Sequence, residues 1–225
     1  MSITQNYKHI KDSLPDGCKL IAVSKTHPIE VIQEAYQSGI RVYGENKVQE
    51  LTAKYEALPK DIEWHLIGHL QRNKVKFIAP FVSLIHSVDS LALLKEIDKE
   101  GAKNNRVIPV LLQIHIAEEE TKFGLSFDEA RDILNSEELN SLNHIIIKGL
   151  MGMATNTPDE AEVRLEFKKL KAFFDSLKSI SQENVRMEEL SMGMSGDYKI
   201  AAEEGSTMVR IGSAIFGQRN YATHE

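Results

Sequence analysis

The chain has 225 residues, of which 42% are hydrophobic and 27% are charged, as in globular proteins with a substantial core. Its formal net charge is −6, so it lacks the electrostatic footprint of a general nucleic-acid binder. No stretch approaches the roughly 20 consecutive apolar residues that span a bilayer, and a membrane protein is therefore not expected.

Short β-rich runs alternate with helical patterns, after a predicted helix over about residues 2–13. Strands are predicted at 19–25, 41–46, 63–68, 83–88, 107–116, 144–153, 187–194 and 208–217. Pro28 is expected to be the first residue of the helix after the first strand. The segments SFDE (126–129) and TPDE (157–160) both match the capping box of a helix start.

This alternation favours parallel strands joined by right-handed crossovers. Eight strands in a chain of this length favour a closed (β/α)8 barrel, with a doubly wound sheet as the alternative. No linker or low-complexity segment divides the chain, so residues 1–225 are expected to form a single domain. In such a barrel, reactive groups lie at the C-terminal ends of the strands and in the loops that follow.

Lys25 ends the first predicted strand. Alternation places Val23 and Lys25 on one face, so Lys25 points into the barrel mouth if Val23 points inside. One interpretation is a lysine whose head extends to solvent. The other is an amine that attacks a carbonyl and forms a Schiff base.

Two further strand ends carry small polar residues. Asn46 ends the YGEN segment and offers a donor and an acceptor, although it is as well suited to cap the next helix. Ser195, in SMGMSGD, follows the seventh strand and is also a candidate helix cap. A helix start preceded by small residues is equally a natural anion site, so both interpretations stay open.

The eighth predicted strand, in VRIGSAIFG, contains Arg210 among apolar residues. A guanidinium keeps its proton, so Arg210 needs an acceptor, either a protein carboxylate or a ligand atom. Gly212 and Ser213 follow with backbone N–H groups and a hydroxyl. Because the loops after strands seven and eight commonly hold a phosphate in (β/α)8 enzymes, these residues favour a ligand.

Strands one and eight are neighbours in a closed barrel, which brings the Lys25 amine near the predicted phosphate loops. A ligand with an aldehyde and a phosphate would bridge them, and pyridoxal 5′-phosphate (PLP) is such a molecule, with Arg210 facing its ring nitrogen. No metal is expected, because His65 and His69 lie on a strand and a loop, with no cysteine or carboxylate at ligand spacing nearby.

Several long segments, in order along nearly the whole chain, resemble the pyridoxal phosphate homeostasis protein family. They are LIAVSKTHP, GIRVYGENKVQE, WHLIGHLQRNK, IHSVDS, KFGL, GLMGMAT, LSMGMSGD and GSTMVRIGSAIFG. The resemblance implies a single TIM barrel similar to PLP fold type III and to the N-terminal domain of alanine racemase, with an extra N-terminal helix.

The same resemblance implies roles for individual residues. Lys25 would hold PLP as a Schiff base, and Arg210 would face the ring nitrogen. Asn46 matches the position beside the cofactor, and the phosphate-binding positions are matched by Ser195, Gly212 and Ser213. Two positions depart from the family, which often has lysine where this chain has His27 and tyrosine where it has Lys47. Loss of the amine at His27 puts in doubt any cofactor transfer through that position.

Family members are known as cofactor binders that affect vitamin B6 and amino-acid homeostasis, without an established catalytic reaction. The resemblance therefore implies a protein that stores or delivers PLP, with PLP-dependent apo-enzymes as recipients. Two alternatives are a PLP-dependent amino-acid racemase and a cofactor-free aldolase that uses Lys25.

Racemisation requires an acid/base on each face of the substrate. The candidates for the second face are Tyr43 and His65. The sequence stops at Glu225, eight residues after IFG, where racemases with this barrel continue into a β-domain. We therefore expect no C-terminal β-domain, a monomer and no enzyme, with a weak side activity left open.

The chain contains a single cysteine, Cys18. A lone thiol excludes an internal disulfide and fits a reducing compartment. The N-terminal segment MSITQNYKHIKD is polar and has no apolar signal core. The expected location is the cytoplasm.

Overall fold

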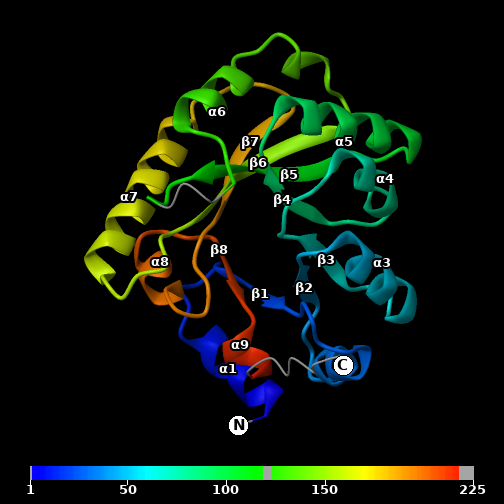
Figure 1. Cartoon of the computed structure of the whole chain (residues 1–225), viewed down its shortest axis with the longest axis vertical. Coiled ribbons are helices and arrows are strands. Elements are labelled where there is room, and N and C mark those ends of the chain that lie inside the picture. The colour runs from blue at the N-terminus through cyan, green and yellow to red at the C-terminus, as the bar shows by residue number, and fades with distance from the viewer. Residues whose placement is uncertain (1, 119–122, 218–225) are drawn as a thin grey trace, which may run out of the picture.

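Eight parallel strands form a closed barrel (Figure 1). In chain order they are β1 (Lys19–Val23), β2 (Val42–Glu45), β3 (Glu63–Leu66), β4 (Leu84–Val88), β5 (Ile108–His115), β6 (Ile145–Met153), β7 (Val185–Ser191) and β8 (Met208–Ile211). The computed structural model describes residues 2–118 and 123–217. Lys122 of the KFGL segment and the chain end at Glu225 lie outside the described residues.

Helices surround the barrel on its outer side (Figure 1). They are α1 (Ile3–Asp12), α2 (Ile29–Gln37), α3 (Val48–Ala57), α4 (Val75–Ile78), α5 (Leu91–Lys103), α6 (Phe127–Leu134), α7 (Glu160–Ser176), α8 (Tyr198–Glu203) and α9 (Ser213–Phe216), with 3-10 turns at Arg72–Lys74 and Leu139–Ser141. No helix in these ranges is long and apolar enough to cross a membrane.

The barrel closes between β8 and β1, where Leu20 lies opposite Val209. The predicted (β/α)8 barrel is therefore confirmed, as is the extra N-terminal helix. A doubly wound sheet is wrong, because each of its two edge strands would have only one neighbour, whereas each of the eight strands here has two.

Asn6 of α1 donates to the carbonyl of Ile215 in α9 at 3.0 Å, which joins the N-terminal helix to the last described helix (Figure 1).

The last predicted strand is too long. β8 ends at Ile211, and the SAIF segment forms α9 instead of continuing the strand. The N–H groups of Ile215 and Phe216 both donate to the carbonyl of Gly212 at 2.9 Å, which starts the helical turn. A short apolar run fits a strand or a helix equally well, and periodicity alone does not decide between them.

Side-chain alternation divides the core into two parts. Inside the barrel lies a small cluster, contributed by five different strands: Ile21, Leu84, Leu111, Met151 and Met208. The larger part of the core, which includes Trp64 and Phe167, packs between the strands and the helices. Because successive residues of a strand point to opposite faces, the two parts alternate along the strands that contribute to both.

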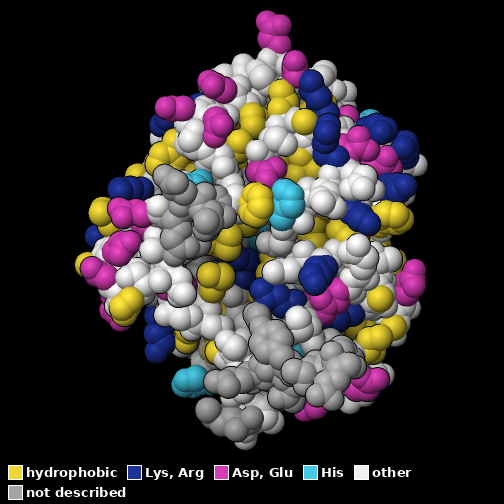
Figure 2. All heavy atoms as spheres, in the orientation of Figure 1, with side chains coloured by type: hydrophobic (Ala, Val, Ile, Leu, Met, Phe, Trp, Pro, Cys, Tyr) yellow, Lys and Arg dark blue, Asp and Glu magenta, His cyan; other side chains and the backbone are white. Residues whose placement is uncertain are grey.

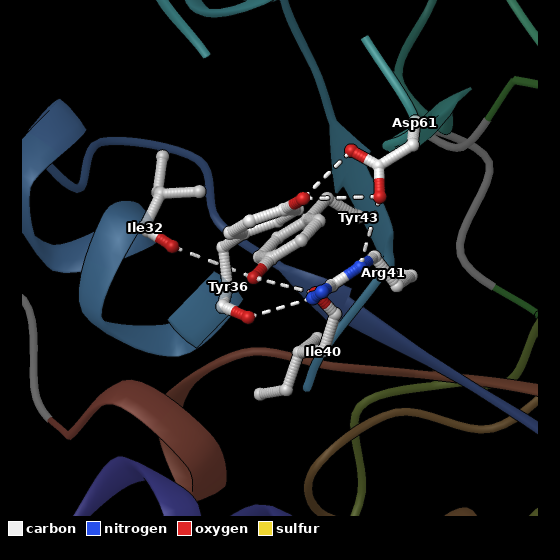
Figure 3. A network of polar contacts seen from close by, with 6 residues as sticks. All are labelled: Ile32, Tyr36, Ile40, Arg41, Tyr43 and Asp61. Atoms are coloured by element: carbon white, nitrogen blue, oxygen red, sulfur yellow. Dashed lines mark hydrogen bonds and ion pairs between the residues drawn. The ribbon is translucent and has the colours of Figure 1, made fainter. Parts of the chain in front are cut away.

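A polar network lies at the N-terminal end of β2, opposite the ends that carry the predicted site (Figure 3). The Arg41 guanidinium lies 3.7 Å from the centre of the Tyr36 ring and donates to the Tyr36 carbonyl at 2.6 Å. Asp61 accepts from Arg41 Nε at 3.2 Å and from the Tyr36 hydroxyl at 2.8 Å. These contacts join α2 to the starts of β2 and β3.

The helix caps were predicted correctly in one case and wrongly in two. Ser126 and Glu129 form the expected capping box. Pro28 lies at the N-cap of α2, one residue before the first helical position. The TPDE segment forms no capping box, because α7 begins at Glu160 and Asp159 caps it.

Replacing Asp159 by alanine is expected to lower the free energy of unfolding by about 1 kcal/mol. The Asp159 carboxylate accepts from the N–H groups of Ala161 and Glu162 at 2.9 and 3.3 Å, and alanine leaves both donors without it. Thr157→Ala should cost less, because that hydroxyl only accepts from Asp159 N at 3.2 Å. Urea unfolding of both variants measures the difference, and a larger loss for Thr157→Ala would contradict the assignment of the cap.

Candidate functional site

A cavity of about 460 Å³ opens at the C-terminal ends of the strands. It is lined by all six site residues predicted from the sequence, which are Lys25, Asn46, Ser195, Arg210, Gly212 and Ser213. Figure 2 shows a hollow near the centre of the molecule, with Lys and Arg side chains (dark blue) inside it and hydrophobic side chains (yellow) around it. The fold thus brings together residues that lie far apart in the chain.

Lys25 lies just beyond the end of β1 and is half-buried. Val23 lines the same cavity, as the alternation of the strand requires. The chain turns sharply after Ser24, whose carbonyl accepts from the His27 N–H at 3.1 Å. Lys25 is therefore placed at the mouth of the barrel, where its amine can reach a ligand in the cavity.

Asn46 and Ser195 line the cavity and neither caps a helix. Lys47 is the N-cap of α3, and Asp197 is the N-cap of α8. The Asp197 carboxylate accepts from the N–H of Met194 at 2.6 Å, which closes the turn that contains Ser195. The capping interpretations of Asn46 and Ser195 are therefore wrong, and both residues are placed to contact a ligand.

Arg210 is almost fully buried, with 4% of its surface exposed. Its guanidinium donates to Ser191 Oγ and, at 3.1 Å, to the carbonyl of Gly152. Burial lowers the pKa of Arg210 to about 10, so it stays protonated at neutral pH. Both acceptors are uncharged, so these hydrogen bonds do not supply the protein carboxylate that the sequence left open.

A chain of hydrogen bonds continues from Arg210 across the inside of the barrel. Ser191 Oγ lies 2.9 Å from His86 Nδ1, and His86 Nε2 lies 2.9 Å from His65 Nδ1. Arg210 can only donate to Ser191 Oγ, and the arrangement that also uses the Ser191 proton has that hydroxyl donating to His86 Nδ1 and the His86 Nε2–H donating to His65 Nδ1. This assignment needs both imidazoles to be neutral. Burial lowers the pKa of His65 to about 3 and that of His86 well below its usual range.

The two buried histidines are expected to make the protein less stable in acid. The unfolded chain takes up a proton on each imidazole below the ordinary pKa of 6.5, whereas the folded chain does not. Stability is therefore present above pH 6.5 and is lost as the pH falls, by up to about 1.4 kcal/mol per pH unit for each histidine.

Urea unfolding between pH 7 and 5 measures this dependence. His86→Gln should flatten it, and His9→Gln, at an exposed position of α1, should not. Equal pH dependence in His86→Gln and the unmodified protein would contradict the neutral pair.

Another part of the cavity lining is built from glycine- and serine-bearing loops. A side-chain carbon at Gly196 would meet no atom within 4 Å, so its backbone is open to the cavity. A side-chain carbon at Gly212 would lie 3.1 Å from the carbonyl oxygen of Val23, so the backbones approach closely there. In α9, the N–H groups of Ile215 and Phe216 donate to the Gly212 carbonyl, whereas those of Ser213 and Ala214 have no preceding carbonyl within the helix to accept them.

The chemistry of this lining suits an electron-rich ligand. Among the described residues around the cavity, Lys25 and Arg210 are cationic, Asn46, Ser195 and Ser213 can donate hydrogen bonds, and none is Asp or Glu. An aldehyde that also carries a phosphate and a ring nitrogen fits these donors. PLP is therefore compatible with the residues that the fold brings together.

Other residues of the cavity were not predicted from the sequence. His69 stacks on Phe123 at a centroid distance of 4.7 Å, and both line the opening. Gln113 of β5 is 5% exposed and donates to the Phe123 carbonyl at 3.0 Å. Strand alternation is compatible with Gln113 on either the inner or the outer face of the barrel, so the sequence did not predict that Gln113 lines the cavity.

Comparisons with known proteins assign the chain to a family. Residues 1–220 match the family model described as alanine racemase, N-terminal domain. The pyridoxal phosphate homeostasis protein of Aquifex aeolicus (strain VF5) is 45% identical over 204 residues, which cover 90% of this chain and 88% of that protein.

Solved structures agree with this assignment. PipY of Synechococcus elongatus PCC7942, in its structure with PLP bound, has a TM-score of 0.86 and 36% identity, with 96% of this chain and 100% of that chain covered. Alanine racemase from Bartonella henselae, with covalently bound pyridoxal phosphate, shares the barrel fold at a TM-score of 0.72 and 17% identity, over 99% of this chain and 60% of the racemase. The chain belongs to the alanine racemase N-terminal domain family and, within it, to the pyridoxal phosphate homeostasis proteins.

Proposed function

We propose that this protein binds PLP in the cavity as a Schiff base on Lys25 and serves intracellular PLP homeostasis. The observation that carries the proposal is one cavity lined by an amine, a buried guanidinium and two serine- and glycine-bearing loops. The relatives named as pyridoxal phosphate homeostasis proteins and the PLP-bound structure of PipY support it.

Each residue has a role that follows from its chemistry. The Lys25 amine would form the covalent bond, and Asn46 would lie beside the ligand. Ser195, Gly212 and Ser213 would donate to the phosphate through hydroxyl and backbone N–H groups. Bound PLP supplies an electrophilic carbonyl carbon and, when its ring nitrogen is protonated, an electron sink.

Arg210 limits what this site does with PLP. A guanidinium donates a hydrogen bond to the ring nitrogen but cannot keep that nitrogen protonated, because it has no acceptor. The chain of neutral groups behind Arg210 supplies no carboxylate to take over that task. The site therefore suits holding the cofactor better than stabilising a carbanion.

The geometry also disfavours the racemase alternative. Tyr43 is fully buried, and its hydroxyl lies 3.3 Å from the Ile40 carbonyl and 3.4 Å from the Ile32 carbonyl, on the outer side of β2 (Figure 3). His65 is engaged with His86 inside the barrel and does not line the cavity. Neither residue is placed as the second acid/base that racemisation needs.

The remaining parts of the proposal concern the cellular role. We propose that the protein acts as a monomer in the cytoplasm, that residues 1–225 work as one PLP-binding domain, and that PLP-dependent apo-enzymes receive the cofactor from it. The lone thiol of Cys18 fits that compartment.

An absorption spectrum tests PLP binding. Addition of PLP to the purified protein should produce the visible band of a Schiff base and a single mass increase after reduction with borohydride. A protein that stays colourless and unmodified after this treatment would contradict the proposed function.

A second experiment separates a carrier from an enzyme. The PLP-loaded protein is incubated with the common amino acids while chirality and keto-acid release are followed. Sustained turnover would show an enzyme. Transfer of PLP to an apo-enzyme faster than spontaneous release from the protein would support delivery, and transfer at the spontaneous rate would contradict it.

A further inference from the structure

A buried group of charged residues lies on the outer side of the barrel, between β2, α3 and the backbone next to Lys25. It consists of Glu45 at the end of β2 and of Lys54 and Glu50 on α3, and is called the Lys54 cluster below. Glu45 is fully buried, Lys54 is 4% exposed, and the Glu50 side chain is 24% exposed. None of the three lines the cavity, so the cluster does not contact a ligand there.

Lys54 uses all three of its ammonium donors within this region. They reach Glu45 Oε1 at 2.6 Å, Glu50 Oε1 at 2.7 Å and the backbone carbonyl of Ser24 at 2.8 Å. The Ser24 hydroxyl also donates to Glu45 Oε1, at 2.6 Å. Lys54 thus connects α3 and β2 to the residue that precedes Lys25.

The cluster also holds the residue that follows Lys25. The Thr26 N–H donates to Glu50 Oε1 at 2.6 Å. Thr26 has a φ of +68°, in the left-handed region that a β-branched residue rarely adopts. A strained conformation persists where its surroundings hold it, and here the hydrogen bond to Glu50 contributes to that hold.

We propose that the Lys54 cluster positions Lys25, because it holds the backbone on both sides of that lysine and so directs its side chain into the cavity. This inference rests on the proposed function, since it concerns the reactivity of Lys25 toward PLP. Strand alternation explains the arrangement: Ser24 and Glu45 point outward to α3, whereas Lys25 and Asn46 point into the barrel mouth. The cluster therefore acts on the site through the backbone of residues 24–26.

Glu50→Ala tests the proposal, because Glu50 is partly exposed and its replacement leaves the buried Glu45–Lys54 pair intact. The PLP-free variant should show faster hydrogen exchange at the Thr26 amide. Its dissociation constant for PLP, from the visible band, should rise about tenfold, as loss of a charge-assisted hydrogen bond allows. Glu50→Gln keeps an acceptor oxygen for the Thr26 N–H and should recover most of both properties.

Lys19→Met is the matched control. It removes the 2.7 Å ion pair between Lys19 and Glu189. Lys19 is the first residue of β1, at the end of that strand far from residues 24–26, which stay unchanged. The variant should leave both the Thr26 exchange and the PLP affinity unchanged. Equal loss of affinity in Lys19→Met and Glu50→Ala would show general weakening of the barrel and would overturn the positioning role.

Lys54→Met gives a stronger test, with Thr26→Gly as its partner. The single variant should lose more PLP affinity than Glu50→Ala, because the Ser24 carbonyl loses its donor and Glu50, which accepts from the Thr26 N–H, loses its ion pair. Glycine adopts a φ of +68° without strain, so adding Thr26→Gly should restore part of the affinity. No recovery in the double variant would overturn the claim that the strained turn is what the cluster holds.

The two proposals fail in different ways. If the unmodified protein gives no visible band with PLP, the proposed function fails and this inference falls with it. If the unmodified protein binds PLP and Glu50→Ala binds it with the same dissociation constant, only the positioning role is overturned.

Discussion

Replacing Lys25 by alanine is expected to abolish the visible absorption band that the protein forms with PLP, together with the mass increase after borohydride reduction. Among the described residues, no lysine other than Lys25 lines the cavity, so alanine removes the amine that forms the covalent bond. Weaker binding should remain, because Arg210 and the serine- and glycine-bearing loops still contact the ligand. Absorption titration and mass spectrometry of the reduced protein measure both effects.

Lys47→Ala serves as the control for Lys25→Ala. Lys47 is exposed at the N-cap of α3, only one residue from the cavity-lining Asn46, but it does not line the cavity itself. Its replacement should leave the band intact. Persistence of the band and of the mass increase in Lys25→Ala would mean that another amine binds PLP, and the assignment of Lys25 would then be wrong.

Replacing Arg210 by methionine is expected to weaken PLP binding by about 10- to 100-fold, the range for a lost hydrogen bond that involves a charged group. Methionine has a similar length but no donor, so the ring nitrogen would lose its partner. The Ser191 hydroxyl would also lose the guanidinium that donates to it. The dissociation constant for PLP and the free energy of unfolding should be measured side by side, because the substitution affects both.

Arg106→Met separates these two effects. Arg106 donates to the carbonyls of Ala79 and Val82 at 2.6 and 2.8 Å and does not line the cavity. The Arg106→Met variant should therefore have a lower free energy of unfolding and an unchanged dissociation constant for PLP. An Arg210→Met protein that binds PLP as tightly as the unmodified protein would show that Arg210 does not contact the cofactor.

The position of Lys25 illustrates what strand periodicity predicts well. Val23 and Lys25 share one face of β1 in any parallel strand, and the end of that strand could be read from the change to polar residues. The sequence did not decide whether that face points into the barrel or outward. Closure of β8 onto β1 decided it, because the face with Ile21 packs into the cluster inside the barrel.

Asn46 and Ser195 show where local reasoning stops. Both stand just before a helix, and a cap or a ligand contact fits the local sequence equally well. The outcome depends on where each helix starts, and the starts at Val48 and Tyr198 left both residues outside the caps. Helix boundaries shift by one or two residues with tertiary packing, so sequence patterns do not settle such cases.

The hydrogen-bond chain behind Arg210 and the Lys54 cluster were not predicted. His65, His86 and Ser191 lie on three strands, and nothing local marks them as neighbours. Lys54 and Glu50 form an ordinary i,i+4 pair on a helix, which is usually exposed and weak. Their burial with Glu45 depends on how α3 packs against β1 and β2.

The barrel, its family and the residue types at the strand ends follow from the sequence, because the alternation of strands and helices and the polar residues after each strand are local properties of the chain. The tertiary structure alone decided which of these side chains share a cavity, which groups accept hydrogen bonds from Arg210, and what supports the turn at Lys25. These features depend on distances between strands that are remote in sequence, and such distances are set only when the barrel closes and its helices pack.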